Sequence, residues 1–279
     1  MSDRKPHEIN LILAGGGVRF GAYIGALHAL QERGVSIKKI VGISGGSIIS
    51  TLYAAGHSLS DLKRLMLEKD YREFKDFSPL SFLAGRGFYS GQRFERWIDG
   101  ELGGKRFADP FHLDHYVVAT DILRGKPVVF SRESFPRLKV SRAARFSIGI
   151  PLFYSYKKFH LTPREYGIMV DGNLASFAMG DMFHNDAYNT LTLRIATSKT
   201  FIESLPRGFS RFSYPRQLVK ILMSSLERER VSGDRWRRTL LIFSGNITST
   251  KFDLSKEEKL FLFDQGYTQV KENLDKKIL

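Results

Sequence analysis

Cysteine is absent from all 279 residues of the chain, which excludes disulfides, thiol catalysis and metal sites with cysteine ligands. No run of about 18 apolar residues occurs, so a transmembrane helix is not expected. The polar segment Met1 to Glu8 leads straight into a predicted strand and does not resemble a secretory signal. These absences predict a cytoplasmic protein.

Positive charge is the strongest bias in the composition. The formal net charge is +14 and the pI is near 9.9, which favours anionic partners such as nucleic acid, acidic lipid or a phosphorylated substrate. Much of the excess lies in residues 207–238, where nine basic side chains accompany three acidic ones. Trp236 between Arg235 and Arg237 is typical of a membrane interface. A solvated helix face is the alternative, and nucleic acid is not favoured because no recognised motif accompanies the stretch.

Short apolar runs alternate with helix-like segments along the chain. Strands are expected at residues 9–14, 37–42, 116–120, 128–130, 168–170, 190–196 and 240–243. Helices are expected at residues 21–33, 47–55, 93–102, 140–146, 215–230 and 255–274, with another capped by Ser58 or Ser60. This alternation predicts an α/β fold with a mostly parallel sheet.

One segment and the domain organisation stand apart from that pattern. Residues 76–91 are aromatic, glycine-rich and without periodicity. No repeat, low-complexity tract or linker divides the chain, so we expect a single domain over residues 1–279. Its chemical motifs fall within about residues 8–200, and its C-terminal part, about residues 205–279, is helical and basic.

Two glycine-rich turns carry the chemistry. In the second, Gly42-x-Ser44-x-Gly46 has the spacing of a nucleophile elbow, in which a strained serine needs small neighbours on both sides. In the first, Gly15-Gly16-Gly17 can present backbone N–H groups at a helix start, where an oxyanion would be stabilised. A dinucleotide fingerprint is not formed because Phe20 stands at its third glycine position, and no Gly-Lys-Ser/Thr follows for a P-loop. The pair of turns favours acyl transfer or ester hydrolysis.

A serine nucleophile needs a base, and the sequence offers several. The histidine candidates are His57, His112, His115, His160 and His184. Asp171 is the candidate among the carboxylates, because it ends an apolar strand and burial there would raise its pKa. An ordinary Asp-Gly turn is the alternative interpretation of Asp171-Gly172.

In this order, Gly-Gly-Gly-x-Arg, Gly-x-Ser-x-Gly and Asp-Gly resemble the patatin-like phospholipase family. Residues 119–121 with 125–130, residues 141–151 and residues 170–172 are similar to it as well, so the resemblance spans residues 11–172. It implies a three-layer α/β/α fold with a mostly parallel central sheet. It also implies a Ser–Asp dyad that needs neither histidine nor metal nor cofactor.

The resemblance also assigns roles. Ser44 would be the nucleophile and Asp171 its base. The remaining positions would build the oxyanion hole and its loop (Gly15, Gly16, Gly17, Arg19), the nucleophile elbow (Gly42, Gly45, Gly46) and the Asp-Gly motif (Gly172). The sequence departs from the family at Phe20, where glycine usually follows the basic residue, so a slightly reshaped first turn is expected.

The resulting expectation is a serine lipid acyl hydrolase, of phospholipase A or lysophospholipase/esterase type, acting on membrane glycerophospholipids through an acyl-enzyme. Its expected lipid contacts are Phe82, Leu83, Phe88, Arg235, Trp236 and Arg237, which would place it peripherally on an anionic lipid surface. One alternative is an α/β-hydrolase with a Ser–Asp–His triad that uses His184 or His160. Another is a lipid-surface binding protein without activity. A regulated antiphage effector with a small-molecule or protein activator is a further possibility.

Overall fold

A computed structural model describes residues 7–175, 188–197 and 238–278, with residues 182, 186, 217–219, 221, 222 and 225. The strands are β1 His7–Leu13, β2 Val35–Ile43, β3 Asp114–Asp121, β4 Lys126–Phe130, β5 Lys157–His160, β6 Tyr166–Val170, β7 Asn189–Ala196 and β8 Thr239–Phe243. The helices are α1 Gly21–Glu32, α2 Gly45–Ala54, α3 Leu59–Glu68, α4 Pro79–Leu83, α5 Gln92–Glu101, α6 Val140–Ser147, α9 Lys256–Asn273 and α10 Asp275–Ile278. Three 3-10 turns join them, η1 Gly17–Phe20, η2 Tyr71–Phe74 and η3 Gly172–Leu174. The predicted helix at 215–230 and the basic stretch at 207–238 lie mostly outside the described residues.

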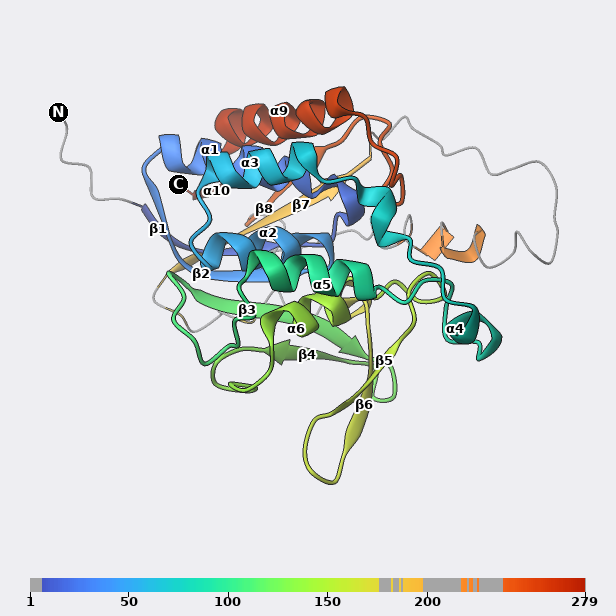
Figure 1. Cartoon of the computed structure of the whole chain (residues 1–279). Helices are drawn as coiled ribbons and strands as arrows, with labels where there is room; N and C mark the ends of the chain where they lie inside the picture. Colours follow the sequence, from blue (N-terminus) through green and yellow to red (C-terminus); the bar gives the residue numbers. More distant parts are fainter. Residues whose placement is uncertain are drawn as a thin grey trace.

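A mixed sheet with a parallel centre organises the fold (Figure 1). Along its main path the strand order is β5-β6-β3-β2-β1-β7-β8, and β4 pairs with β3. The central strands β3, β2, β1, β7 and β8 run parallel, whereas β4 and β6 pair antiparallel with β3, and β5 pairs antiparallel with β6. The expected α/β fold with a mostly parallel central sheet is confirmed.

Successive side chains of the central strands divide between the two faces of the sheet. On one face, residues such as Leu13 of β1 and Leu193 of β7 join the main hydrophobic core with α1, α2, α3, α5, α6 and α9. On the other face, Ile12, Val41 and Val118 form a smaller cluster against β4 and Met182. Within the ranges given above, no helix is both long and apolar enough to cross a membrane.

Helices α1 and α9 lie side by side at the top of Figure 1 and approach unusually closely. A Cβ atom at Gly25 of α1 would lie 1.9 Å from the carbonyl oxygen of Phe263, and one at Gly266 of α9 would lie 1.8 Å from that of Ala22. Only glycine fits at these two crossing points, so the pair of helices packs backbone to backbone over the sheet.

Helix capping follows the sequence, whereas α4 and β5 lie where no helix or strand was expected. Ser58 caps α3, and Ser255 with Glu258 forms the capping box at the start of α9, both as expected. The loop expected over 76–91 instead contains the short helix α4, which Ser78 caps just before Pro79. Strand β5 was not predicted, because its Lys-Lys-Phe-His sequence lacks an apolar run and is held by pairing with β6.

The register of the strands brings three sequence-distant residues into one row. In the parallel register of β1 with β2, Gly15 falls level with Ser44, just beyond both strand ends. The registers of β2 with β3 and of β3 with β6 place Ser44 and Asp171 level with the same residue, Ala119. The loops after β1, β2 and β6 therefore converge at the carboxyl edge of the parallel sheet, where open α/β sheets place their sites.

Candidate active site

Ser44 sits on a strained turn between β2 and α2. Its backbone has φ 50° and ψ −126°, and among the described residues only Leu152 is another non-glycine residue with positive φ. A Cβ at Gly42 would lie 1.9 Å from Ser50 Oγ, and one at Gly46 would lie 2.2 Å from the carbonyl oxygen of Leu13. Glycine at these positions lets the strand and helix approach, and such strain commonly marks a functional residue.

Hydrogen bonds from neighbouring elements hold this turn. The Ser44 N–H donates to Ser147 Oγ at 2.8 Å, and Ser147 Oγ donates to the carbonyl oxygen of Val118 at 2.5 Å. The carbonyl oxygen of Ser44 accepts from both the N–H and the hydroxyl of Ser47, at 2.8 and 2.6 Å. The last residue of α6 thus links the serine turn to β3.

The Ser44 hydroxyl donates to Asp171 Oδ2 at 2.7 Å. The other carboxylate oxygen of Asp171 accepts from the Asn173 N–H at 2.8 Å, and the Asp171 N–H donates to the carbonyl oxygen of Gly149 at 2.9 Å. Asp171 is 1% exposed. Burial raises its pKa to about 6, against the opposing effect of the hydrogen bonds from Ser44 and Asn173.

The first glycine turn lies against residues close in sequence to both members of this pair, Gly45 directly after Ser44 and Asn173 two residues after Asp171. A Cβ at Gly45, next to Ser44, would lie 2.3 Å from the carbonyl oxygen of Gly17, and one at Gly15 would lie 2.7 Å from the side chain of Asn173. Within the described part of the chain, the N–H groups of Gly15, Gly16 and Gly17 have no hydrogen-bond acceptor. They are therefore available to an oxyanion formed beside Ser44.

Arg19 supports the turn from within the core. Its fully buried guanidinium donates to the carbonyl oxygen of Gly16 at 3.0 Å and to Ser244 Oγ at 3.2 Å. Phe20, the departure from the family pattern, is buried, and its ring lies 4.9 Å from that of Tyr71. The aromatic side chain is thus accommodated in the core while η1 leads directly into α1.

Three of the candidate histidines lie at the other end of the sheet. The backbone of His112 bonds to Ala54 at the end of α2, about 15 Å along that helix from its start. His57 also follows α2, and its ring bonds to the carbonyl oxygen of Glu101. His115 is buried against Thr51, and burial lowers its pKa to about 3.

His160 and His184 are the histidines that the triad alternative would use, and the structure describes the position of His160. His160 is exposed on β5 and pairs with Tyr166, five residues before Asp171, which is about 17 Å along a strand. His184 lies outside the described residues. Of the histidines that the structure describes, none forms a hydrogen bond with Ser44, whose hydroxyl donates to Asp171.

The expected lipid contacts divide between two regions. In α4 and its flanks, Leu83 is 80% exposed and Phe82 46%, while Phe88 is half-buried with its ring 5.3 Å from that of Phe82. The Phe88 N–H donates to the carbonyl oxygen of Leu152, in the loop between α6 and β5. The other expected contacts, Arg235, Trp236 and Arg237, lie outside the described residues.

Sequence reasoning missed two residues of the site, Ser147 and Asn173. Ser147 accepts a hydrogen bond from the N–H of Ser44 through its Oγ. The N–H of Asn173 donates to the carboxylate of Asp171, and its side chain lies against the position that a Cβ of Gly15 would take. Ser147 was visible only as part of the segment 141–151, because its role depends on contacts made across the sheet. Asn173 directly follows the Asp-Gly pair, and that position was the available signal.

At the carboxyl edge of this α/β fold, the Ser44 hydroxyl donates to a buried carboxylate. Beside it lie backbone N–H groups that have no acceptor among the described residues. The model of the patatin-like phospholipase family matches residues 11–184, more than half of the chain. The chain therefore belongs to the patatin-like phospholipase family, and this membership supports a lipid hydrolase.

Relatives and solved structures agree with this assignment. The uncharacterised protein YqhO of Bacillus subtilis is 25% identical over 92% of this chain and 95% of its own length. A neuropathy target esterase of Drosophila melanogaster is 24% identical over 64% of this chain, a match that covers 12% of the esterase. VipD from Legionella pneumophila shares the fold, with a TM-score of 0.62 at 16% identity over 98% of this chain and 67% of VipD.

The raised pKa of Asp171 predicts a pH-dependent cost to stability. The native pKa, about 6, lies above the ordinary value of 3.8, so the folded protein loses stability as the pH rises from about 4 to 6 and stays lower above that. Asp171→Asn removes the titration, and we expect it to raise the free energy of unfolding at pH 8 by up to about 3 kcal/mol. The gain should vanish near pH 4.

Thermal or urea unfolding at pH 4 and pH 8 measures this difference. Asp70→Asn is a control in which the pKa shift has the opposite sign. Hydrogen bonds from Arg72 lower the pKa of that exposed carboxyl to about 2. The substitution should not stabilise the protein at pH 8. A variant at Asp171 that is less stable than the parent at both pH values would contradict the prediction.

Proposed function

We propose that the protein is a serine lipid acyl hydrolase in which Ser44 is the nucleophile and Asp171 its base. The observation that carries the proposal is the 2.7 Å hydrogen bond from the Ser44 hydroxyl to the buried Asp171 carboxylate, formed at a strained elbow. The glycine turn beside it supplies donors for an oxyanion. A serine is otherwise a poor nucleophile, and a base within hydrogen-bond reach is what activates it.

The reaction follows from this geometry. Ser44 Oγ attacks the ester carbonyl while its proton passes to Asp171, and backbone N–H groups of Gly15, Gly16 and Gly17 stabilise the tetrahedral oxyanion. The alcohol then leaves with the proton from Asp171, and an acyl-enzyme remains on Ser44. Water, deprotonated by the same carboxylate, releases the fatty acid and restores the hydroxyl.

The environment of Asp171 suits it to this cycle. With a pKa of about 6, it is mostly ionised at neutral pH and can accept the serine proton. It is also a stronger base than an ordinary carboxylate, because burial has raised its affinity for the proton. The same residue can therefore serve as the base in the first step and as the acid when the alcohol leaves.

We further propose that the substrate is a membrane glycerophospholipid reached by peripheral association with an anionic surface. Family membership supports a lipid ester, and the net charge of +14 favours anionic lipid. Leu80 and Leu83 on α4 are 82% and 80% exposed, at the side of the molecule to which the arrowhead of β3 points (Figure 1). Two such side chains on one short helix are suited to enter the acyl region of a bilayer.

Removing either member of the pair tests the chemistry. We expect Ser44→Ala and Asp171→Asn each to lower hydrolysis of phospholipid vesicles and of a soluble short-chain ester by about 10⁴-fold or more. His160→Ala and His184→Ala should leave both activities within about twofold. Mass spectrometry of released fatty acid and lysophospholipid measures the loss, and circular dichroism checks that each variant is folded.

Near-normal turnover after either dyad substitution would remove that residue from the mechanism. Loss of activity on substitution of His184 would favour a Ser–Asp–His triad instead. A wild-type protein that binds vesicles, releases no fatty acid and is not labelled by a fluorophosphonate would be a lipid-surface binding protein without activity.

If α4 inserts into the bilayer, removing its leucines should affect hydrolysis of phospholipid in vesicles far more than hydrolysis of an ester dissolved in water. Leu80→Ser combined with Leu83→Ser should reduce hydrolysis of phospholipid vesicles by about tenfold or more, because each lost leucine removes about 1.5 kcal/mol or more of insertion free energy. Hydrolysis of a water-soluble ester should fall far less. Vesicle sedimentation measures binding directly.

Phe261→Ser is the matched control, since Phe261 is also exposed but lies on α9, away from α4 in Figure 1. It should leave binding to vesicles intact. Equal losses on vesicles and on the soluble ester in the α4 variant would show that the helix supports the fold or the chemistry and not the lipid surface.

A further inference from the structure

A cavity of about 360 Å³, lined mostly by charged and polar residues, lies between α5, α6 and β5 and shares no lining residue with the Ser44–Asp171 site. The walls include Glu95 and Arg96 of α5, Arg142 and Phe146 of α6, and Lys157 of β5. Its volume is in the range of small-molecule sites and well above what one or two waters fill. Nothing in the proposed reaction uses this cavity.

Positive charge is in excess around it. Four basic and two acidic side chains line the cavity. One of the acids, Asp99, is already engaged, accepting from Lys139 at 2.9 Å and from Ser141 at 2.7 Å. Glu95 is then the one acidic side chain of the lining left to balance three basic ones, those of Arg96, Arg142 and Lys157. This leaves an excess of two positive charges for a ligand to neutralise.

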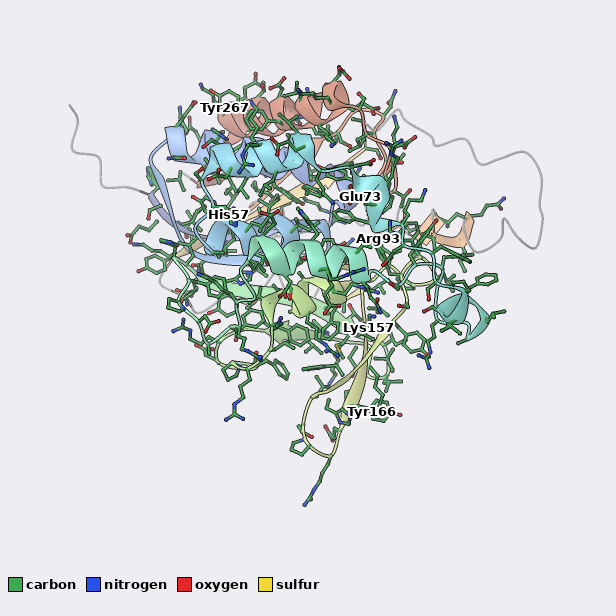
Figure 2. The ribbon with its side chains drawn as sticks, viewed as in Figure 1. His57, Glu73, Arg93, Lys157, Tyr166 and Tyr267 are labelled. Atoms are coloured by element: carbon green, nitrogen blue, oxygen red, sulfur yellow. The ribbon has the colours of Figure 1, made fainter. Side chains whose placement is uncertain are left out.

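Lys157 is the most constrained of these cations. Its side chain is half-buried, and its pKa is lowered by that burial and by the nearby guanidinium groups of Arg145 and Arg142. In the part of the chain that the structure describes, its ammonium group forms no hydrogen bond or ion pair. Figure 2 labels Lys157 close to α6 and below the start of α5, where Arg93 is labelled.

The buried guanidinium group of Arg145 supplies a fixed positive charge near this ammonium group. Arg145 is fully buried and donates to the carbonyl oxygens of Ser90 and Ser155 at 2.7 and 2.8 Å, so these bonds hold its guanidinium group in place. The Arg142 guanidinium lies 5.8 Å from the centroid of the Phe146 ring, and within the described residues it forms no hydrogen bond or ion pair. An anion placed in the cavity would meet the guanidinium groups of Arg96 and Arg142 and the ammonium group of Lys157. Across the described part of the chain, none of these three groups is engaged in an ion pair.

We propose that the cavity between α5, α6 and β5 binds a phosphate monoester, with Lys157, Arg142 and Arg96 as its ligands. A phosphate dianion matches the excess of two charges, and guanidinium groups bind phosphate oxygens in a bidentate manner. The volume exceeds that of phosphate alone, so the ester carries an organic group that rests against Phe146. The phosphate belongs either to a soluble metabolite or to the headgroup of a lipid.

Binding is tested on the full chain carrying Ser44→Ala, so that the outcome does not depend on the proposed hydrolysis. Isothermal titration calorimetry with glycerol 3-phosphate represents the soluble source. Sedimentation with phosphatidylcholine vesicles, with and without phosphatidic acid, represents the lipid source. Acetate at equal ionic strength controls for general attraction to a basic protein.

The proposal predicts saturable binding in at least one of the two arms, weakened about tenfold or more by Lys157→Met or Arg142→Gln. Lys158→Met is the matched control, because the neighbouring residue on β5 is exposed and its ammonium lies over the ring of Tyr166, outside the cavity. It should bind as the parent does. Circular dichroism and thermal unfolding check that each variant is folded.

Several outcomes would overturn the proposal. These are absence of saturable binding in both arms, equal binding of acetate, and equal weakening by Lys158→Met. Saturation with glycerol 3-phosphate assigns a soluble ligand, and binding only to vesicles with phosphatidic acid assigns a lipid headgroup.

Discussion

The hydrogen bond between the Ser44 hydroxyl and the Asp171 carboxylate is the interaction on which the rest of the account depends. It joins residues 127 positions apart. It forms because β2 and β6 both align with β3, so that the two residues beyond their ends meet at one level. The strand registers of the sheet therefore set the distance between Ser44 and Asp171, the proposed nucleophile and base.

That arrangement has a cost in stability which the surrounding structure offsets. A non-glycine residue at positive φ carries strain of about 1–3 kcal/mol, and a buried carboxylate without a cationic partner among the described residues is unfavourable at neutral pH. Ser147 and Ser47 hold the strained turn by hydrogen bonds, and Asn173 and Gly149 fix Asp171. Over the same sheet, α1 and α9 pack backbone to backbone at Gly25 and Gly266.

Much of this site could be predicted from the sequence because its requirements are local. The glycines at 42 and 46 are needed where a strand turns sharply into a helix, and the structure shows the contacts that exclude any side chain there. The alternation of strands and helices likewise predicted the parallel centre of the sheet. The raised pKa of Asp171 followed from its place at the end of an apolar strand.

What the sequence did not reveal depends on contacts between distant segments. Ser147 is an ordinary serine at a helix end until β3 and the elbow are placed beside it. Strand β5 exists because β6 pairs with it, and its own residues carry no strand pattern. The charged cavity beside α6 has the same origin, since Lys157 and Arg142 come together only in the folded chain.

The most direct test of the account is the pH dependence of labelling of the wild-type protein by a fluorophosphonate, with the modified residue located by mass spectrometry. We expect a single adduct on Ser44, whose rate of formation rises with pH to a plateau with a midpoint near 6. We expect Asp171→Asn to lose that adduct. An adduct on another residue, or on Ser44 at an undiminished rate without Asp171, would contradict the account.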